Sequence, residues 1–251
     1  TVPKPAPPVN VHSAMGLVVT RPRGLLWGQG GSMDFRTIRY EKLGAVLRIT
    51  ANRPEVLNAQ SRAMILELDE AFRAASEDDA TRVIIVAGAG AHFSAGHDLG
   101  SPDELEDQKA HPVGPGLPEN LKRLSELYLE ATLRWRDVSK PTIAQVQGYC
   151  IMGGLMLASC CDLIIAAEDA TFGLPEVDRG ALGAATHLAR LVPQHKMRAM
   201  VYTAATATAD ELAAFGSVLK VVPRNELRAA ALEVADAIAA KSPTVIRAAK
   251  E

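Results

Sequence analysis

Uninterrupted apolar runs alternate along this chain with longer stretches in which apolar residues recur at helical spacing. Short runs of this kind are typical of strands that are buried on both faces of a parallel sheet. They predict strands at residues 82–87, 142–146 and 163–167, and a shorter one at 218–222. Residues 35–50 read as two further strands joined by a turn.

Helical periodicity fills the intervals between these runs. Ser61 is suited to cap a helix that continues to about residue 76, because the apolar residues after it would share one face. Further helices are predicted at residues 119–137, directly after the pair Gly153-Gly154, from about Ala184 onward, and after the N-cap Ser242 with its first-turn Pro243.

Strands that alternate with helices indicate βαβ units and therefore an α/β fold with a mostly parallel sheet. Two stretches read as loops between these elements. Residues 100–118 are polar and carry proline and glycine, and residues 171–183 lack clear periodicity. In folds of this class ligands bind outside the carboxyl ends of the strands, so the loops at those ends are the candidate site.

The composition fits one globular domain with appendages. The chain has 251 residues, of which 48% are apolar and 22% are charged, and a net charge of −2. This near-neutral balance gives no reason to expect nucleic acid or a membrane surface as a partner. The three cysteines, Cys150, Cys160 and Cys161, lie in apolar segments and are expected to be reduced core residues of a cytoplasmic protein.

The first part of the chain differs from the rest. Residues 1–32 are rich in proline and glycine and show no sustained periodicity, so we expect a disordered N-terminal extension or a tag, with Met33 as a possible native start.

The central candidate for a ligand site is the turn at Gly153-Gly154. An apolar strand leads into it and a compact apolar helix follows. Backbone N–H groups at the start of a helix are free to hold an anion, and glycines let a ligand approach the backbone. Taken alone, the pattern equally fits a tight strand-to-helix turn that binds nothing.

Several classes of enzyme are not indicated. The chain lacks a phosphate-binding G-x-x-x-x-G-K-[ST] loop, an H-E-x-x-H zinc motif and a G-x-S-x-G nucleophile elbow. The six histidines do not show the spacing of a metal site, so no metal is expected; a site formed by His92, His97 and Asp98 is the alternative.

Three segments together indicate a catalytic site. They are residues 93–99, which form a second glycine turn, the pair Gly153-Gly154, and residues 171–176, which end in Glu176. Two backbone N–H groups from separate turns can bind one oxygen and stabilise a thioester carbonyl as it becomes an enolate. A carboxylate such as Glu176 can move a proton next to that enolate.

In this order and spacing the motifs resemble the crotonase superfamily, also called enoyl-CoA hydratase/isomerase, from about Phe35 to the end of the chain. The matching segments are Arg53 to Ala59, the A-G-x-D-L segment that ends at Leu99, Gly148 to Asp162, and the F-G-x-P-E segment that ends at Glu176. The resemblance implies the crotonase (ClpP/crotonase-like) fold, a ββα-superhelix core with a C-terminal helical region. It also implies an acyl-CoA substrate, with coenzyme A entering as part of that substrate rather than as a permanent cofactor.

By position, the resemblance places the two oxyanion-hole amides on His97 and Gly153 and the acid/base on Glu176. The segment Ala95, His97, Asp98 and Leu99, together with Gly153, would contact the CoA thioester. The His97 ring either joins the pocket or turns aside into packing. Asp178 is a further catalytic candidate, because in an extended loop it would point the same way as Glu176; a surface pair with Arg179 is the alternative.

One departure from the family affects the reaction. Hydratases of the family use two glutamates, and the first of them falls on Met156, which cannot titrate. With Glu176 alone, proton transfer between carbons remains feasible, as in the family's isomerases. Hydration would need His97, Asp178 or an ordered water as a substitute.

Residues 170–195 resemble a more specific group, the actinobacterial crotonase-like hydrolases that open the last steroid rings as CoA thioesters. The first half of the chain looks more like generic enoyl-CoA hydratases. We therefore expect an enoyl-CoA hydratase/isomerase-type enzyme, with a C–C bond hydrolase of a cyclic β-diketone CoA ester as one alternative. A non-catalytic acyl-CoA-binding homologue is the other alternative.

The resemblance also predicts the organisation of the chain. Residues 33–223 would form the crotonase core, and residues 224–251 would begin a helical region that assembles a homotrimer or a dimer of trimers. Helical sequence continues up to Glu251, so this region is expected to be truncated.

Overall fold

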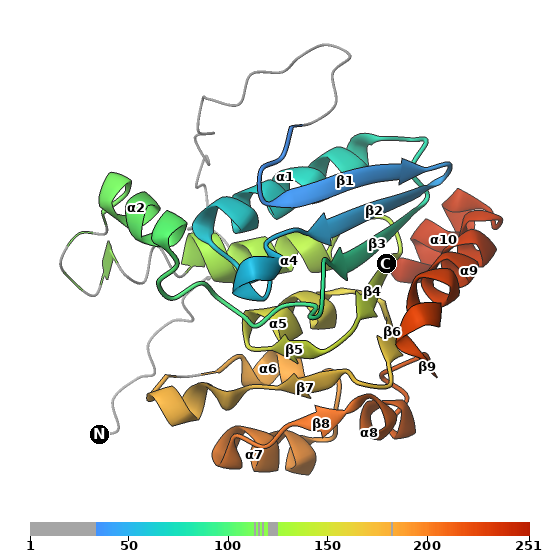
Figure 1. Cartoon of the computed structure of the whole chain (residues 1–251). Helices are drawn as coiled ribbons and strands as arrows, with labels where there is room; N and C mark the ends of the chain where they lie inside the picture. The colour runs from blue at the N-terminus through green and yellow to red at the C-terminus, as the bar shows by residue number, and fades with distance from the viewer. Residues whose placement is uncertain (1–33, 113, 115, 117, 120–124, 182) are drawn as a thin grey trace, which may run out of the picture. The chain divides into compact units, whose positions relative to one another are not determined.

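The computed structural model describes residues 34–251 with the exception of 113, 115, 117, 120–124 and 182. Its main sheet has six strands in the order β1-β2-β3-β4-β6-β9 (Figure 1). The strands are β1 (Ile38–Leu43), β2 (Val46–Ala51), β3 (Val83–Gly88), β4 (Thr142–Val146), β6 (Leu163–Ala167) and β9 (Lys220–Val222). Only the pair β1–β2 is antiparallel, which confirms the predicted α/β fold with a mostly parallel sheet.

The apolar runs form strands because helices cover both faces of the sheet. Every residue of β2, β3 and β4 is buried. On one face α9 (Leu227–Ala239) packs against residues of β2, β3, β4 and β6. The opposite face holds the larger core, with α1 (Arg62–Glu77), α4 (Glu130–Arg136) and α5 (Gly153–Cys160).

A second sheet of three strands lies beside α5 and supports the loops that follow the main sheet. It has the order β5-β7-β8, with β5 (Tyr149–Ile151), β7 (Thr171–Gly173) and β8 (Ala207–Thr208). β5 and β7 run parallel, and β7 and β8 run antiparallel. Further elements are η1 (Pro54–Val56), η3 (Pro175–Arg179), α6 (Ala185–Leu188), α7 (Gln194–Thr203), α8 (Ala209–Ala214), η4 (Arg224–Glu226) and α10 (Pro243–Lys250).

Three predicted elements differ in the structure. The polar stretch predicted as a loop at 100–118 contains helix α2 (Pro102–Ala110), whose first turn is capped by Ser101 Oγ, 3.3 Å from the N–H of Glu104. The predicted loop 171–183 holds β7 and the short helix η3. In the predicted helix 119–137, the π-helical turn η2 (Ser125–Leu129) comes before α4, and residues 120–124 lie outside the described part.

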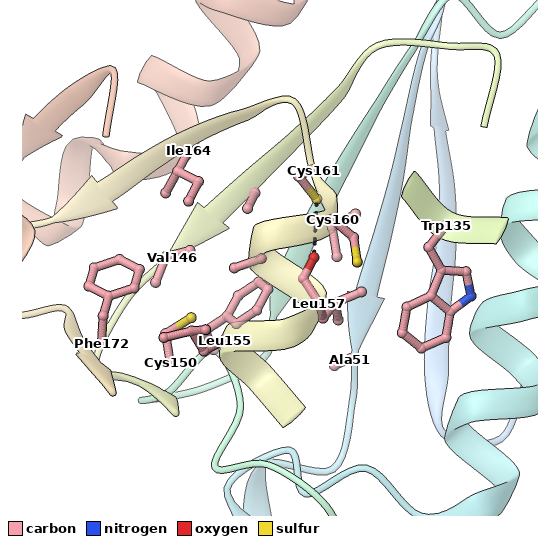
Figure 2. Close-up of a cluster of buried hydrophobic side chains, with 14 of the residues drawn as sticks. Ala51, Trp135, Val146, Cys150, Leu155, Leu157, Cys160, Cys161, Ile164 and Phe172 are labelled. Atoms are coloured by element: carbon pink, nitrogen blue, oxygen red, sulfur yellow. Dashed lines mark hydrogen bonds between the residues drawn. The ribbon is translucent and has the colours of Figure 1, made fainter. Parts of the chain in front are cut away.

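The three cysteines are free and buried, as predicted for core residues. Figure 2 shows them around α5, among Val146, Leu155 and other apolar side chains. Burial raises the pKa of the Cys160 thiol to about 11 and raises the pKa values of Cys150 and Cys161 as well. These thiols therefore stay protonated and contribute packing rather than reactivity.

The ends of the chain were also the subject of predictions. The expected disordered extension, residues 1–32, lies outside the described residues. The C-terminal residues 224–251 are helical, as η4, α9 and α10. Because α9 covers one face of the main sheet, it belongs to the core; the role of this region in a trimer stays a prediction. Within the described ranges, no helix is both long and apolar enough to cross a membrane.

Candidate active site

The turn between β5 and α5 is built on an unusual backbone conformation. Met152 has φ 52° and ψ −125°, a region that costs a non-glycine residue strain energy, and it is the N-cap of α5. The turn is held in place by the Met152 N–H, which donates to the Gly173 carbonyl of β7 at 3.0 Å. This conformation directs the start of α5 toward the loop that follows β3.

The side chains of Gln60 and His97 lie close to Gly153. A Cβ at this position would lie 2.7 Å from Gln60 Oε1 and 2.8 Å from His97 Cε1. A Cβ here would push the ends of these two side chains aside, so glycine leaves the room that the Gln60 amide and the His97 ring occupy. The same contacts show that the His97 ring lies directly beside Gly153.

The second glycine turn, residues 93–99, abuts the first. Ser94 pairs with Cys150 of β5, and a Cβ on Gly96 would lie only 3.2 Å from the Gly153 nitrogen. Gly96 has φ +100°, a conformation that favours glycine. Packing between the two turns therefore brings together His97 and Gly153; that their amides form an oxyanion hole stays a prediction.

Some of the backbone N–H groups around His97 donate hydrogen bonds within the protein, and others do not. The Ala95 N–H donates to Leu57 O at 3.0 Å, and the Asp98 N–H donates to Gln60 O at 3.0 Å. Within the part of the chain that the structure describes, the N–H groups of His97 and Gly153 donate to no protein acceptor. Gly153 is the first residue of α5, where such a free donor is expected.

The side chain of His97 packs beside Gly153 and Tyr128. Its ring meets the ring of Tyr128 edge-on, with 4.2 Å between centroids. Burial lowers the pKa of His97 to about 4, so the imidazole is neutral at physiological pH. Its Nδ1 atom is buried and has no hydrogen-bond partner among the described residues.

A small cavity of about 10 Å³ lies between these groups. This volume is close to the minimum that holds one water molecule. The cavity is lined by residues of the two turns and of the helices around them, namely Gln60, Ile65, His97, Leu127, Tyr128, Thr132, Trp135, Gly153 and Met156.

Glu176 follows β7 in the short helix η3. Since Ile151 of β5 is opposite Gly173 of β7 in a parallel pair, Gly153 and Glu176 leave the small sheet at the same end. The carboxylate atom Glu176 Oε2 is buried without a partner among the described residues, and burial raises the pKa of this group. A carboxylate in this state is a stronger base than a solvated one.

Asp98 does not line the cavity but connects the segments around it. Its Oδ2 atom lies 2.7 Å from Arg53 Nη1 in a buried ion pair and accepts a hydrogen bond from Ser101 Oγ at 2.6 Å. Burial alone would raise the pKa of Asp98, but hydrogen bonds from Ser101, Arg53 and the Gly100 N–H lower it overall. This network joins the loop that begins at Arg53 to residues 93–99 and to the start of α2.

The geometric argument for Asp178 was wrong. It assumed an extended loop, but Asp178 lies in the 3₁₀-helix η3, where residues two apart point in different directions, and its side chain is exposed. Leu99 is 78% exposed and Ala95 is half-buried. Contacts of Ala95, His97, Asp98, Leu99 and Gly153 with a CoA thioester stay a prediction.

Sequence reasoning did not single out three side chains that shape the site: Gln60, Tyr128 and Trp135. Gln60 directly follows the Asn58-Ala59 pair of the early loop motif, and its position there could have indicated a role. The two aromatic residues occur in a helical pattern in which they read as core. In the described residues, no group of three or more His, Cys, Asp or Glu side chains is arranged to hold a metal ion.

Comparison with known proteins agrees with this geometry. The family model described as enoyl-CoA hydratase/isomerase matches residues 41–251, so the chain belongs to the enoyl-CoA hydratase/isomerase family. The prediction of a crotonase-fold enzyme that acts on acyl-CoA thioesters is thereby confirmed.

Individual relatives fall into the two groups that the sequence indicated. The chain is 44% identical over 206 residues to the (7aS)-7a-methyl-1,5-dioxo-2,3,5,6,7,7a-hexahydro-1H-indene-carboxyl-CoA hydrolase of Mycobacterium tuberculosis, covering 82% of this chain and 79% of the relative. It is 40% identical over 230 residues to a putative enoyl-CoA hydratase of the same organism, covering 84% of this chain and 71% of the relative.

A solved structure shows the same fold. The crystal structure of a probable enoyl-CoA hydratase from Mycobacterium smegmatis matches with a TM-score of 0.77 and 41% identity, covering 85% of this chain and 83% of that chain.

Proposed function

We propose that this enzyme generates a thioester enolate in an oxyanion hole formed by the backbone N–H groups of His97 and Gly153. The observation that carries this proposal is the packing of the two glycine turns. It brings together two N–H groups that donate to no other acceptor in the described chain. Two preorganised donors stabilise the negative charge that develops on a carbonyl oxygen when the α-carbon loses a proton.

Glu176 is the acid/base in this proposal. Its buried, unpartnered Oε2 atom is on the loop that leaves the small sheet beside Gly153, and burial raises the pKa of the carboxyl group, which makes the carboxylate a stronger base. The carboxylate removes or returns the proton at the substrate α-carbon while the thioester oxygen stays in the hole. Asp98, held by Arg53, supports residue 97 and does not transfer the proton.

The leading reaction is hydration or isomerisation of an enoyl-CoA thioester. With Met156 at the position of a second carboxylate, Glu176 is the one carboxylate that the motifs supply for this chemistry. One carboxylate suffices to shuttle a proton between two carbons, so isomerisation needs no further group from the protein.

Hydrolysis of a C–C bond is a second candidate, favoured by a specific comparison. The hydrolase of M. tuberculosis cited above and that of Rhodococcus jostii, which is 42% identical over 206 residues, both carry an indene-carboxyl-CoA substrate in their names. In such a reaction water attacks a ring ketone, and the bond between that carbon and the thioester α-carbon breaks. The electron pair becomes the enolate held by the hole. The attacking water loses a proton as the carboxylic acid forms, and Glu176 carries that proton to the α-carbon.

One mass measurement distinguishes these candidates. The enzyme is incubated with crotonyl-CoA, a 3-enoyl-CoA or a cyclic β-diketone CoA ester in H₂¹⁸O. Water added to crotonyl-CoA would show a hydratase, and a shifted double bond without added mass would show an isomerase. A ring-opened acid that carries ¹⁸O would show the C–C hydrolase. Exchange of α-protons of a saturated acyl-CoA in D₂O tests enolate formation directly; if exchange is absent, the proposed function is wrong.

Assembly and location remain predictions as well. The family resemblance supports a homotrimer or a dimer of trimers and a cytoplasmic enzyme without a permanent cofactor. Analytical ultracentrifugation of the full chain tests the oligomeric state.

A further inference from the structure

The cavity beside the two amides carries polar groups that the enolate mechanism does not use. Two of the side chains that line it have a buried nitrogen without a partner among the described residues, His97 Nδ1 and Trp135 Nε1. An indole N–H can only donate a hydrogen bond, whereas one nitrogen of a neutral imidazole accepts. Both groups are desolvated on folding and lack a protein partner, which is costly unless something polar satisfies them.

Water is the ligand that fits this cavity. About 10 Å³ admits one water molecule and nothing larger. One water could accept from Trp135 Nε1–H and donate to His97 Nδ1. The Gln60 side chain and the Tyr128 phenol line the same cavity and supply further polar neighbours.

We propose that this cavity is the site of the reacting water and that His97 Nδ1 is the base that activates it. The inference rests on the proposed function, because it uses the same enolate and the same Glu176. It assigns to the imidazole of His97 the role that Met156, which lines the same cavity, cannot perform. The backbone N–H of His97 would bind the thioester oxygen while its ring acts on water.

Every proton is accounted for in the proposed addition of water. The water oxygen forms a bond to the electrophilic carbon, and the proton it loses passes to His97 Nδ1. The thioester oxygen takes up the electron pair as an enolate in the hole. The imidazolium proton passes through water to the Glu176 carboxylate, which delivers it to the α-carbon, so the enzyme ends in its starting state.

The surroundings favour a neutral imidazole before the reaction. Tyr128 is the other titratable side chain among the described residues that line the cavity, and the lining from α1, α4 and α5 carries no charged group. The neighbouring charge, Asp98, is paired with Arg53. Without a carboxylate against the ring, His97 stays unprotonated and able to accept a proton.

Two variants of His97 separate water activation from enolate formation. Both keep the backbone N–H. In His97→Asn the amide oxygen can accept a hydrogen bond from water in place of Nδ1 but cannot take its proton, and His97→Ala removes both functions. The readouts are water addition to whichever CoA ester the wild type hydrates or hydrolyses, and α-proton exchange of butyryl-CoA in D₂O, which needs the hole and Glu176 but no reacting water.

We expect His97→Asn and His97→Ala to lower water addition by about 100-fold or more. We expect exchange to fall by less than about 10-fold, because the two N–H donors remain. Equal losses in both assays, or water addition within about 3-fold of wild type, would overturn the role of the imidazole. A wild type that exchanges α-protons but adds water to no substrate would also overturn it, and would leave the proposed enolate chemistry standing. A wild type without exchange would overturn both.

Discussion

The side-chain amide of Gln60 donates a hydrogen bond to the backbone carbonyl of Gly153, with 3.1 Å between Nε2 and O. The backbone of the same residue brackets His97, because the Gln60 N–H donates to Gly96 O at 2.7 Å and Gln60 O accepts from the Asp98 N–H. One residue therefore connects the two turns whose amides form the proposed hole. Gln60 is a positioning residue, since it sets the relative placement of the two donors.

Replacing Gln60 by leucine tests this connection. The side chain keeps its approximate size but loses the hydrogen bond to Gly153, so we expect kcat to fall by about 10- to 100-fold with KM within about 3-fold. A matched control is Gln147→Leu, which removes another buried side-chain amide that is not part of the proposed hole. The Gln147 amide donates to Gly88 O, with 2.7 Å between Nε2 and O. Steady-state kinetics and thermal melts of both variants make the comparison. If Gln60→Leu lowers only the melting temperature, its role is structural.

Gly153→Ala addresses the hole itself. The added methyl would lie within 3 Å of Gln60 Oε1 and His97 Cε1, so these two side chains have to move, and the Gln60 hydrogen bond that positions the Gly153 turn is disturbed. We expect kcat to fall by about 10- to 100-fold, because the donor is less precisely placed. Gly100→Ala is the control, because a Cβ there meets nothing within 4 Å. Retention of activity in Gly153→Ala would show that catalysis does not depend on the positions of the Gln60 and His97 side chains.

Glu176→Gln is expected to uncouple activity from stability. Removing the base should slow α-proton exchange by about 100- to 10,000-fold. At pH 7 the variant should be at least as stable as the wild type, because the buried Glu176 Oε2 lacks a partner and its charge is costly to desolvate. The folded-state pKa is raised, so this cost disappears as the pH falls through that pKa and the wild-type carboxylate takes up a proton. Urea unfolding at pH 7 and pH 4.5 measures the change; a less stable variant at pH 7 would contradict it.

Removing one partner of the buried Arg53–Asp98 pair is expected to destabilise the protein. Arg53→Met leaves the Asp98 carboxylate buried without its charge partner, which should lower the free energy of unfolding by about 3–5 kcal/mol. Lys220→Met, which removes one partner of an exposed pair with Glu233, should cost less than about 1 kcal/mol. Because the Asp98 pKa is lowered in the folded state, its contribution is present above the unfolded pKa and is lost as the pH falls through the folded value. Denaturant titrations at pH 7 and pH 3.5 test both points; equal costs for the two variants would contradict the first.

Much of this fold follows from local patterns. The apolar runs of β3, β4 and β6 are strands because each is covered on both faces, and apolar continuity records that burial directly. Helix α2 did not stand out because its polar residues carry little apolar periodicity. It is held instead by the Ser101 cap and by Glu104, whose Oε2 accepts from the Arg62 N–H at 3.0 Å. Such long-range hydrogen bonds leave no periodic signal in the sequence.

The backbone turns of the candidate site could be predicted from the sequence. Gly96 has a backbone conformation that favours glycine, and Gly153 leaves room for the Gln60 and His97 side chains; both glycines are visible in the sequence. The direction of a side chain is not visible in the same way. The His97 ring packs in the room that Gly153 leaves and against the ring of Tyr128, and Asp178 is exposed in the 3₁₀-helix formed by residues 175–179.

The buried imidazole of His97 should also be detectable as a pH-dependent loss of stability. Burial lowers its folded-state pKa to about 4, whereas an unfolded histidine titrates near 6.5. Between these values the unfolded chain binds a proton that the folded chain does not, so the free energy of unfolding falls as the pH is lowered from about 6.5 to about 4.

The His97→Asn variant lacks this contribution. The difference in unfolding free energy between wild type and variant should therefore shift by on the order of 2 kcal/mol over that range, with the wild type losing more. His187, whose pKa is also lowered by burial and by Arg190 and Arg136, is present in both proteins and cancels in the comparison. Urea titrations at pH 7, 5.5 and 4 provide the measurement. A difference that stays constant with pH would show that the ring is solvated, and the cavity beside Gly153 would then not hold a desolvated base.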